Sequence, residues 1–210
     1  MTLKSEYKYY KRTKLMENST VTIIKDTSAN PGPLGLLAFG MTTVLLNLHN
    51  AGFYELNSMI LAMGIFYGGS AQIVAGILES KKNNAFGMTA FISYGFFWLT
   101  LVGLLLMPEL DIYEGTSTSG MIAYFIMWGI FTGLFFIGTL RISKALQVVF
   151  GSLTILFFLL ALGRYTGSEL IGTITGYEGI FCGASAIYAG VGTLLNEVYG
   201  KVVMPLGPVK

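Results

Sequence analysis

Six nearly uncharged apolar blocks fill most of this sequence and limit the folds open to it. They lie at about residues 33–49, 58–78, 85–107, 119–139, 145–163 and 171–194. A run of about 18 or more apolar residues is long enough to cross a bilayer as a helix. Because the bilayer offers the backbone no hydrogen-bond partner, each block must pair its own N–H and C=O groups. We therefore expect an all-α integral membrane protein with six transmembrane helices.

The segments outside these blocks are too short and too polar to form a second domain. Only 11% of the residues are charged, whereas a soluble domain carries about 25%. We expect a polar, basic tail at residues 1–29, a six-helix transmembrane domain at residues 30–200 and a short tail at residues 201–210. The single cysteine, Cys182, excludes an internal disulfide and a cysteine-based metal site.

The basic residues predict the orientation of the chain. Of the 13 Lys and Arg residues, all but Arg164 fall in the two tails or in the loops after the second and fourth blocks. Loops rich in Lys and Arg stay in the cytoplasm. We therefore expect a multi-pass protein of the cell membrane with both termini in the cytoplasm.

The segment Asn30 to Leu36 marks the start of the first helix. Pro31 and Pro33 suit a first helical turn, which needs no N–H from them, and Asn30 is a good N-cap residue. The free N–H groups of a helix N-terminus also favour an anion. The segment can therefore be a capped helix start alone or a start that also touches an anion.

Polar side chains recur on faces that do not suit lipid. Phe39, Thr43, Asn47 and Asn50 follow one another at spacings of four, four and three, so they share one face of the first helix. Such a face should look into the bundle.

The later blocks also carry polar groups at membrane depth. Gln72 lies in the middle of the second block, where an unpaired amide is costly, so it needs a neighbouring helix or a solute as its partner. Tyr94 brings a hydroxyl to the middle of the third block, and Ser185 brings one to the sixth.

The inventory of reactive side chains argues against an enzyme. No group of His, Asp and Glu has metal-ligand spacing, and no base lies beside a plausible nucleophile. His49, Glu79 and Glu178 are the candidates for carrying a proton, and each lies toward the end of a block. We expect no cofactor, no metal and no nucleic-acid partner.

Several separated motifs together resemble one family. They are Asn30 to Leu36, read as NPGPLGL, FGMTTVLLNLHNAG at 39–52, GGSAQIVAG at 68–76, SYGFFW at 93–98 and CGASAIY at 182–188. These resemble the acetate uptake transporter family, the succinate–acetate transporters, over roughly residues 28–206. The family's opening motif has alanine where Gly32 stands here.

The resemblance implies a homohexamer in the bilayer, with a path for acetate, succinate and other small monocarboxylates in each protomer. It also implies an apolar constriction of Phe39, Tyr94 and Leu153. Asn47, Gln72, Tyr94 and Ser185, together with Thr43, are then the expected substrate contacts.

The driving force and the substrate class stay open at this point. The scarcity of acidic residues at membrane depth favours passive conduction of the anion, or passage of the acid with its own proton, over proton symport, for which such residues are usual. A channel for small neutral solutes or ammonium also fits glycine-rich helices with aromatic constrictions. A sensor or scaffold has only the N-terminal tail in its favour.

Overall fold

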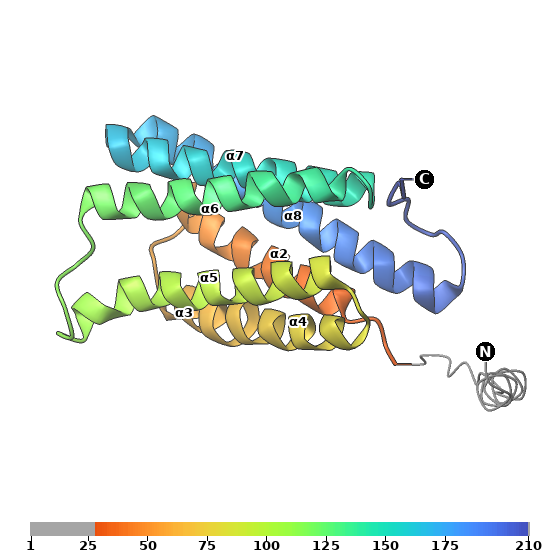
Figure 1. Cartoon of the computed structure of the whole chain (residues 1–210). Helices are drawn as coiled ribbons and strands as arrows, with labels where there is room; N and C mark the ends of the chain where they lie inside the picture. The colour runs from red at the N-terminus through yellow and green to blue at the C-terminus, as the bar shows by residue number, and fades with distance from the viewer. Residues whose placement is uncertain (1–27, 210) are drawn as a thin grey trace, which may run out of the picture.

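Six spans long and apolar enough to cross a membrane run through residues 28–209, the part of the chain that the computed structural model describes. They are α2 (Gly32–Asn50), a composite span (Ser58–Lys81), α5 (Ala85–Glu109), α6 (Thr118–Thr139), α7 (Lys144–Thr166) and α8 (Glu169–Tyr199). The expected all-helical membrane fold is confirmed. The first described residues and the C-terminal segment lie at the same end of the bundle (Figure 1).

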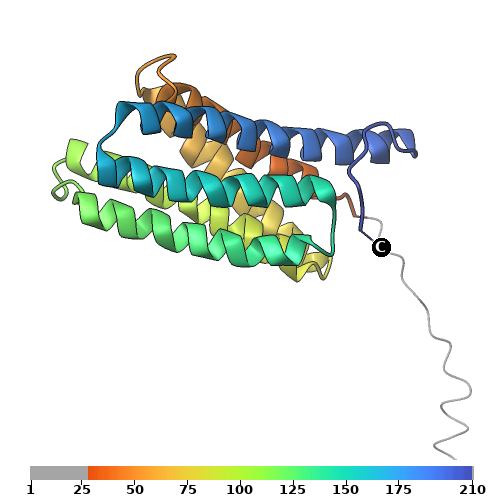
Figure 2. The same ribbon diagram turned by 90° about the horizontal axis from the view of Figure 1, so that it is seen from above.

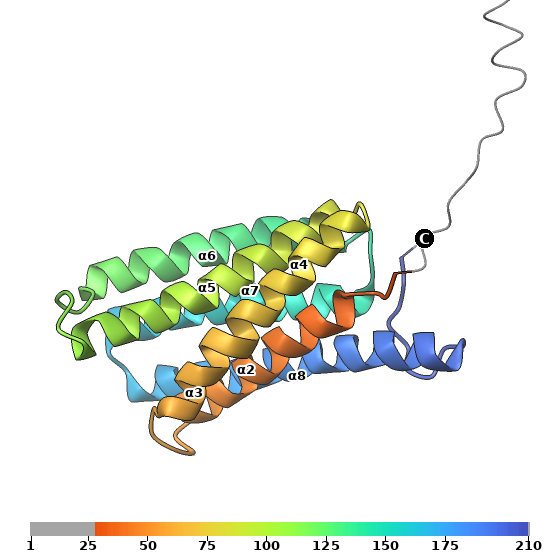
Figure 3. The same cartoon turned by 90° about the horizontal axis from the view of Figure 1, so that it is seen from below.

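The spans pack in neighbouring pairs. α2 packs most extensively against α8, α6 packs against α7, and the end of the composite span packs against α5. In Figure 1, α6 and α7 lie above α5, and α2 and α8 cross behind them. Figure 2 shows α8 beside α7, and Figure 3 shows the composite span lying across α5 and α2.

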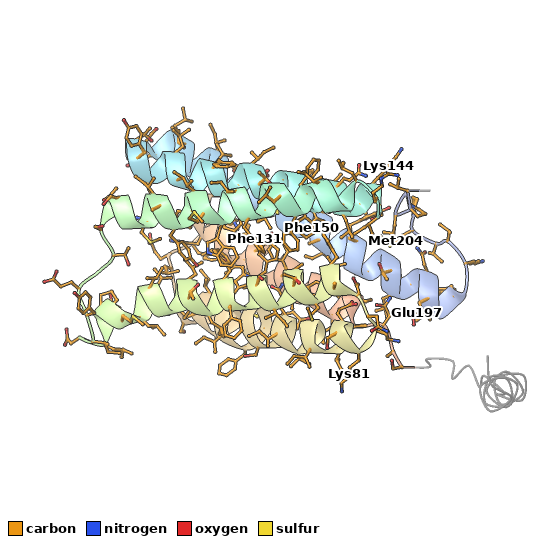
Figure 4. The ribbon with its side chains drawn as sticks, in the orientation of Figure 1. Lys81, Phe131, Lys144, Phe150, Glu197 and Met204 are labelled. Carbon is orange, nitrogen blue, oxygen red and sulfur yellow. The ribbon has the colours of Figure 1, made fainter. Side chains whose placement is uncertain are left out.

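Aromatic rings fill the space between α5 and the α6–α7 pair. The ring of Phe97 on α5 packs edge-on against Trp128 of α6 at 5.2 Å and against Phe157 of α7 at 5.1 Å between ring centroids. Phe131 and Phe150, labelled in Figure 4, both contact a ring on α5. These rings lie between the backbone of α5 and the backbones of α6 and α7, and cavities remain between the helices.

The composite span is not the regular helix that the sequence predicts for residues 58–78. It consists of α3 (Ser58–Ala62), the π-helix η1 (Met63–Ala71) and α4 (Gln72–Lys81). The wider π-turns, with hydrogen bonds from i to i+5, change the direction in which the following residues point. A Cβ added to Gly68 in this stretch would lie 2.9 Å from the methyl carbon of Thr42, so α2 leaves no room for a side chain there.

The first helix begins slightly differently from the prediction. Pro31, not Asn30, holds the N-cap position, and its carbonyl accepts a hydrogen bond from the N–H of Gly35 at 3.2 Å. Asn30 still caps the helix from one residue farther out, because its Oδ1 accepts from the N–H of Gly32 at 3.0 Å. The expected tail at residues 1–29 lies outside the described residues apart from Ser28 and Ala29.

The last helix is longer than the predicted block at 171–194, and it ends at Tyr199 where Gly200 takes the left-handed conformation with φ 61°. The segment after it folds back along the bundle. Asn196 accepts hydrogen bonds from the N–H groups of Val203 and Met204, and the N–H of Lys144 donates to the carbonyl of Gly207 at 2.8 Å. Figure 4 shows Met204 and Lys144 at this end of the molecule. The short C-terminal segment is therefore packed against the start of α7.

Close contact between the backbones of α2 and α8 depends on glycine. A Cβ added to Gly183 would lie 2.7 Å from the carbonyl oxygen of Gly40, and a Cβ added to Gly40 would lie 2.7 Å from that of Gly183. Small residues at such crossings let membrane helices approach closely and gain van der Waals contact. The crossing places Phe39, the neighbour of Gly40, at a fixed depth in the bundle.

We expect Gly183→Ala to lower the free energy of unfolding by about 1–3 kcal/mol, because overpacking forces the two backbones apart. The matched control is Gly172→Ala in the same helix, where an added Cβ meets nothing within 4 Å. Thermal unfolding of the purified variants in detergent measures the effect. Equal midpoints for the two variants would contradict the close crossing.

Candidate functional site

Phe39, Tyr94 and Leu153 meet in the core of the bundle, from α2, α5 and α7. All three are buried, and the ring centroids of Phe39 and Tyr94 lie 5.9 Å apart. Two cavities meet at this point, since Phe39 and Leu153 line both of them. The structure therefore brings together the three residues expected to form a constriction and gives each side of it a space.

The larger space, which we call the distal cavity, lies toward the end of the bundle away from the termini. Its volume is about 150 Å³, and its wall includes Thr43, Asn47, His49, Trp98 and Arg164. The smaller space, the proximal cavity, lies toward the termini, has a volume of about 20 Å³ and is lined by nine residues. A volume of about 10–15 Å³ holds one water molecule. The proximal cavity in this conformation is therefore too small for a carboxylate.

The polar groups that α2 sends to the distal cavity are hydrogen-bonded among themselves. Thr43 Oγ1 donates to the carbonyl of Phe39 at 2.7 Å, and Asn47 Nδ2 donates to the carbonyl of Thr43 at 2.9 Å. Asn50 Nδ2 in turn donates to Asn47 Oδ1 at 3.0 Å. The chain of bonds fixes the rotamers of these three polar side chains.

The Tyr94 hydroxyl is occupied in this conformation. It donates to Thr132 Oγ1 at 2.9 Å, and Thr132 donates to the carbonyl of Trp128 at 2.7 Å. The ring of Tyr94 also packs edge-on against Phe131 at 5.8 Å and Phe150 at 6.0 Å. Tyr94 therefore acts here as a rigid wall of the constriction, and its oxygen keeps free lone pairs only.

Gln72, unlike Tyr94, has a buried polar atom with no hydrogen-bond partner among the described residues. It begins α4 directly after the π-helix, lines the proximal cavity and is only 1% exposed. Its Oε1 has no hydrogen-bond partner among the described residues. A buried polar atom without a partner costs about 1–3 kcal/mol. Of the two partners that the sequence allowed for Gln72, a neighbouring helix does not supply one to this oxygen.

Two residues that line the distal cavity were not among those that the sequence predicts for the site. Trp98 lines the distal cavity, is buried, and its indole N–H has no partner in the described part of the chain. A tryptophan in the middle of a span was itself a signal, because its N–H needs an acceptor. Arg164 lines the same cavity. The sequence shows that Arg164 is the only basic residue outside the tails and the basic loops. It gives no pattern that places Arg164 at a cavity.

Other expected residues lie away from the constriction. Ser185 lines a separate surface cavity beside Lys144 and Tyr188, and its hydroxyl donates to the carbonyl of Cys182 at 2.7 Å. Its distance from the proximal and distal cavities follows from the rotation of α8, which turns Gly183 and Ala186 toward the core. Glu178 is half-buried on α8 and lines neither cavity among the described residues.

Of the two remaining proton-carrying candidates, both in the described part of the chain, His49 lines the distal cavity and Glu79 lines neither the distal nor the proximal one. His49 Nδ1 is bonded to the carbonyl of Tyr54 at 2.9 Å, which leaves Nε2 for another partner. Glu79 is buried at the opposite end, where Asn84 Nδ2 donates to its Oε2 at 2.8 Å. The carboxylate lies close to Gly32 and Gly87, at the N-termini of α2 and α5, whose partial positive charge stabilises it.

The arrangement of two cavities about an apolar constriction can be compared with known proteins. Residues 14–209 match the GPR1/FUN34/yaaH family. The chain belongs to this family. It is 56% identical over 179 residues to the succinate-acetate/proton symporter SatP of Escherichia coli (strain K12), covering 85% of this chain and 95% of that protein. The family expected from the motifs is therefore confirmed.

The chain is also similar to one solved structure and to one relative from yeast. The solved structure titled "Structure of the bacterial acetate channel SatP" superposes with a TM-score of 0.85 at 55% identity, covering 86% of this chain and all of that one. The ammonia transport outward protein 2 of Saccharomyces cerevisiae (strain ATCC 204508 / S288c) is 32% identical over 180 residues, covering 80% of this chain and 64% of that protein.

We expect Gln72→Met to leave the free energy of unfolding unchanged or to raise it by about 1 kcal/mol, because it removes a buried oxygen that has no partner. The matched control is Gln147→Met, since Gln147 Nε2 donates to the carbonyl of Thr139 at 3.4 Å. The control should lose about 0.5–1 kcal/mol. Thermal unfolding in detergent measures both, and a clear loss for Gln72→Met would show that a helix partner holds the amide.

Proposed function

We propose that this multi-pass membrane protein transports acetate, and with it succinate and other small monocarboxylates, through a pathway inside each protomer. The observation that carries the proposal is the junction of two cavities at Phe39, Tyr94 and Leu153. The likeness to SatP supports the substrate class.

Acetate joins one methyl group to one carboxylate, and the two ends need different surroundings. The second N–H of the Asn47 amide and the indole N–H of Trp98, both on residues that line the distal cavity, replace part of the water that the carboxylate loses. On the other side of the constriction, rotation of the Gln72 amide presents its NH₂ group to the same carboxylate. Between these groups the apolar side chains exclude water, so dewetting sets the barrier.

The conformation described is closed, so passage requires the constriction to widen. Phe39 and Leu153 are the side chains shared by the two cavities, and neither makes a polar bond that must break. Rotation of these two side chains opens the path at the cost of packing contacts only. Tyr94 stays fixed by Thr132.

We propose passive conduction of the anion as the mode of transport. The described residues that line the proximal and distal cavities include no Asp or Glu, and His49 is their one candidate for carrying a proton. The competing mode is proton symport, which the name of the Escherichia coli relative states for that protein. Symport would have to use His49, Glu79 or Glu178.

A voltage-clamped bilayer separates the two modes. With equal pH on both sides, an acetate gradient should drive a current that reverses at the acetate equilibrium potential. Electroneutral uptake that acidifies the lumen, with no such current, would contradict passive conduction.

A channel for ammonium is the second candidate, because the Saccharomyces cerevisiae relative is named for ammonia transport. Competition separates the two substrate classes. Propionate should inhibit uptake of labelled acetate, whereas methylamine and glycerol should not. Inhibition by methylamine with no effect of propionate would favour the ammonium channel.

The assembly and the orientation belong to the proposal as well. We propose a homohexamer in the plasma membrane, as the family resemblance implies, with both termini in the cytoplasm. The distal cavity then faces the outside and the proximal cavity the cytoplasm. The concentration of Lys and Arg at the end of the bundle that holds the termini supports this orientation.

We expect Leu153→Ala and Phe39→Ala to raise the rate of acetate uptake several-fold and to admit larger monocarboxylates, because each widens the constriction. The matched control is Leu162→Ala, on the same helix as Leu153 but with an exposed side chain. Uptake of labelled acetate, propionate and butyrate into proteoliposomes measures the effect. Rates equal to the control for both variants would contradict the assignment of the constriction.

A further inference from the structure

We infer that Arg164 makes the distal mouth of the pathway an anion-capture subsite, which favours dicarboxylates over monocarboxylates and both over uncharged solutes. The inference rests on the proposed function for its substrates. It concerns a residue outside the constriction, at the other end of α7 from the expected basic loops.

Arg164 stands where two cavities adjoin. It lines the distal cavity together with Trp98 and Leu153, and it lines an open cavity of about 370 Å³ together with Thr118 and Glu169. Asn50 also lines both. A solute that passes from the open cavity into the distal cavity therefore passes the guanidinium.

The charge of this guanidinium is not neutralised in the described structure. Arg164 is exposed, and within residues 28–209 its guanidinium has neither a hydrogen bond nor an ion pair. Glu169 lines the open cavity with it but forms no ion pair. His49 is the other titratable group in the distal cavity. Among residues 28–209, Arg164 is the only Lys or Arg that lines the distal cavity, and a guanidinium binds a carboxylate through two parallel N–H bonds.

Arg164 and the constriction lie apart along α7. Arg164 lies eleven residues after Leu153 on a continuous helix, which corresponds to about 16 Å along the axis. The guanidinium therefore contacts solutes at the mouth of the distal cavity and does not touch those at the constriction.

Neutral donors stand between the captured anion and the constriction. The Trp98 indole N–H is buried in the wall of the distal cavity and has no partner in the described chain. An anion that leaves the exposed guanidinium can pass to this donor and then to the α2 amides. Because an exposed guanidinium holds a carboxylate only weakly, capture raises the local concentration without trapping the solute.

Charge gives the subsite its selectivity. A dianion such as succinate gains twice the attraction that acetate gains from the same guanidinium, and an uncharged solute gains none. Salt screens the attraction, so the preference should be largest at low ionic strength.

The first experiment measures the anion subsite without transport. In Asn50→Cys, the new thiol lies in both cavities that Arg164 lines, and the native Cys182 is fully buried. We expect the ratio of its reaction rates with anionic and cationic methanethiosulfonates, in detergent at about 10 mM salt, to fall about fivefold or more when Arg164→Gln is added. Arg164→Lys should retain most of the ratio, and about 0.5 M salt should abolish the difference.

Controls distinguish a local charge effect from a general one. Arg141→Gln, at the opposite end of the bundle, should leave the ratio unchanged. Thr118→Cys, in the open cavity, serves as a second reporter if Asn50→Cys fails to fold. An unchanged ratio on addition of Arg164→Gln, in the reporter that folds, would overturn the anion subsite.

The second experiment measures selectivity in proteoliposomes. We expect Arg164→Gln to lower succinate uptake at low salt by about the square of the factor by which it lowers acetate uptake, because twice the attraction is twice the free energy. Equal factors would overturn the preference for dicarboxylates. If the wild-type protein moves neither solute, the proposed function fails, whereas the thiol-reactivity ratio still decides whether Arg164 forms an anion subsite.

Discussion

The close contact between α2 and α8 is the constraint on which the pathway depends. At Gly40 and Gly183 the two backbones meet with no side chain between them. Asn47 continues the contact about two turns later along α2, since its side chain occupies the place that a Cβ on Gly179 would need. With α2 held at this depth, Phe39 is presented to the centre of the bundle, where it faces Tyr94.

The polar groups of the core divide into two sets with different physical roles. Thr43, Asn47 and Tyr94 are hydrogen-bonded within the protein, so they stabilise one arrangement of the walls. Gln72 and Trp98 keep one buried polar atom each without a partner. Both residues line the cavities beside the constriction, Trp98 the distal one and Gln72 the proximal one. The indole N–H is a donor and can bond a carboxylate, whereas the amide oxygen is an acceptor, so Gln72 would have to turn its NH₂ group toward an anion.

Glu79 and Arg164 lie toward opposite ends of the bundle. Glu79 is fixed between the N-termini of α2 and α5, where helix dipoles and Asn84 stabilise its negative charge. Its burial therefore has a structural explanation that requires no proton transfer. Arg164 marks the other end with an unpaired positive charge. Between them the path is neutral, which suits an anion that must enter, cross and leave.

The sequence by itself determined the six spans and the family, and it singled out Phe39 and Tyr94, two of the three residues that meet between the cavities. Apolar length and the bilayer's lack of hydrogen-bond partners fix the spans, and the spacing of Phe39, Thr43 and Asn47 fixes their shared face. Leu153 came only from the family resemblance, because one leucine among many has no pattern of its own. The tertiary structure alone decided the π-helix before Gln72, the separation of Ser185 from the cavities and the place of Arg164 at the distal mouth. These depend on how each helix is rotated against its neighbours, and that rotation follows from contacts between segments distant in the chain.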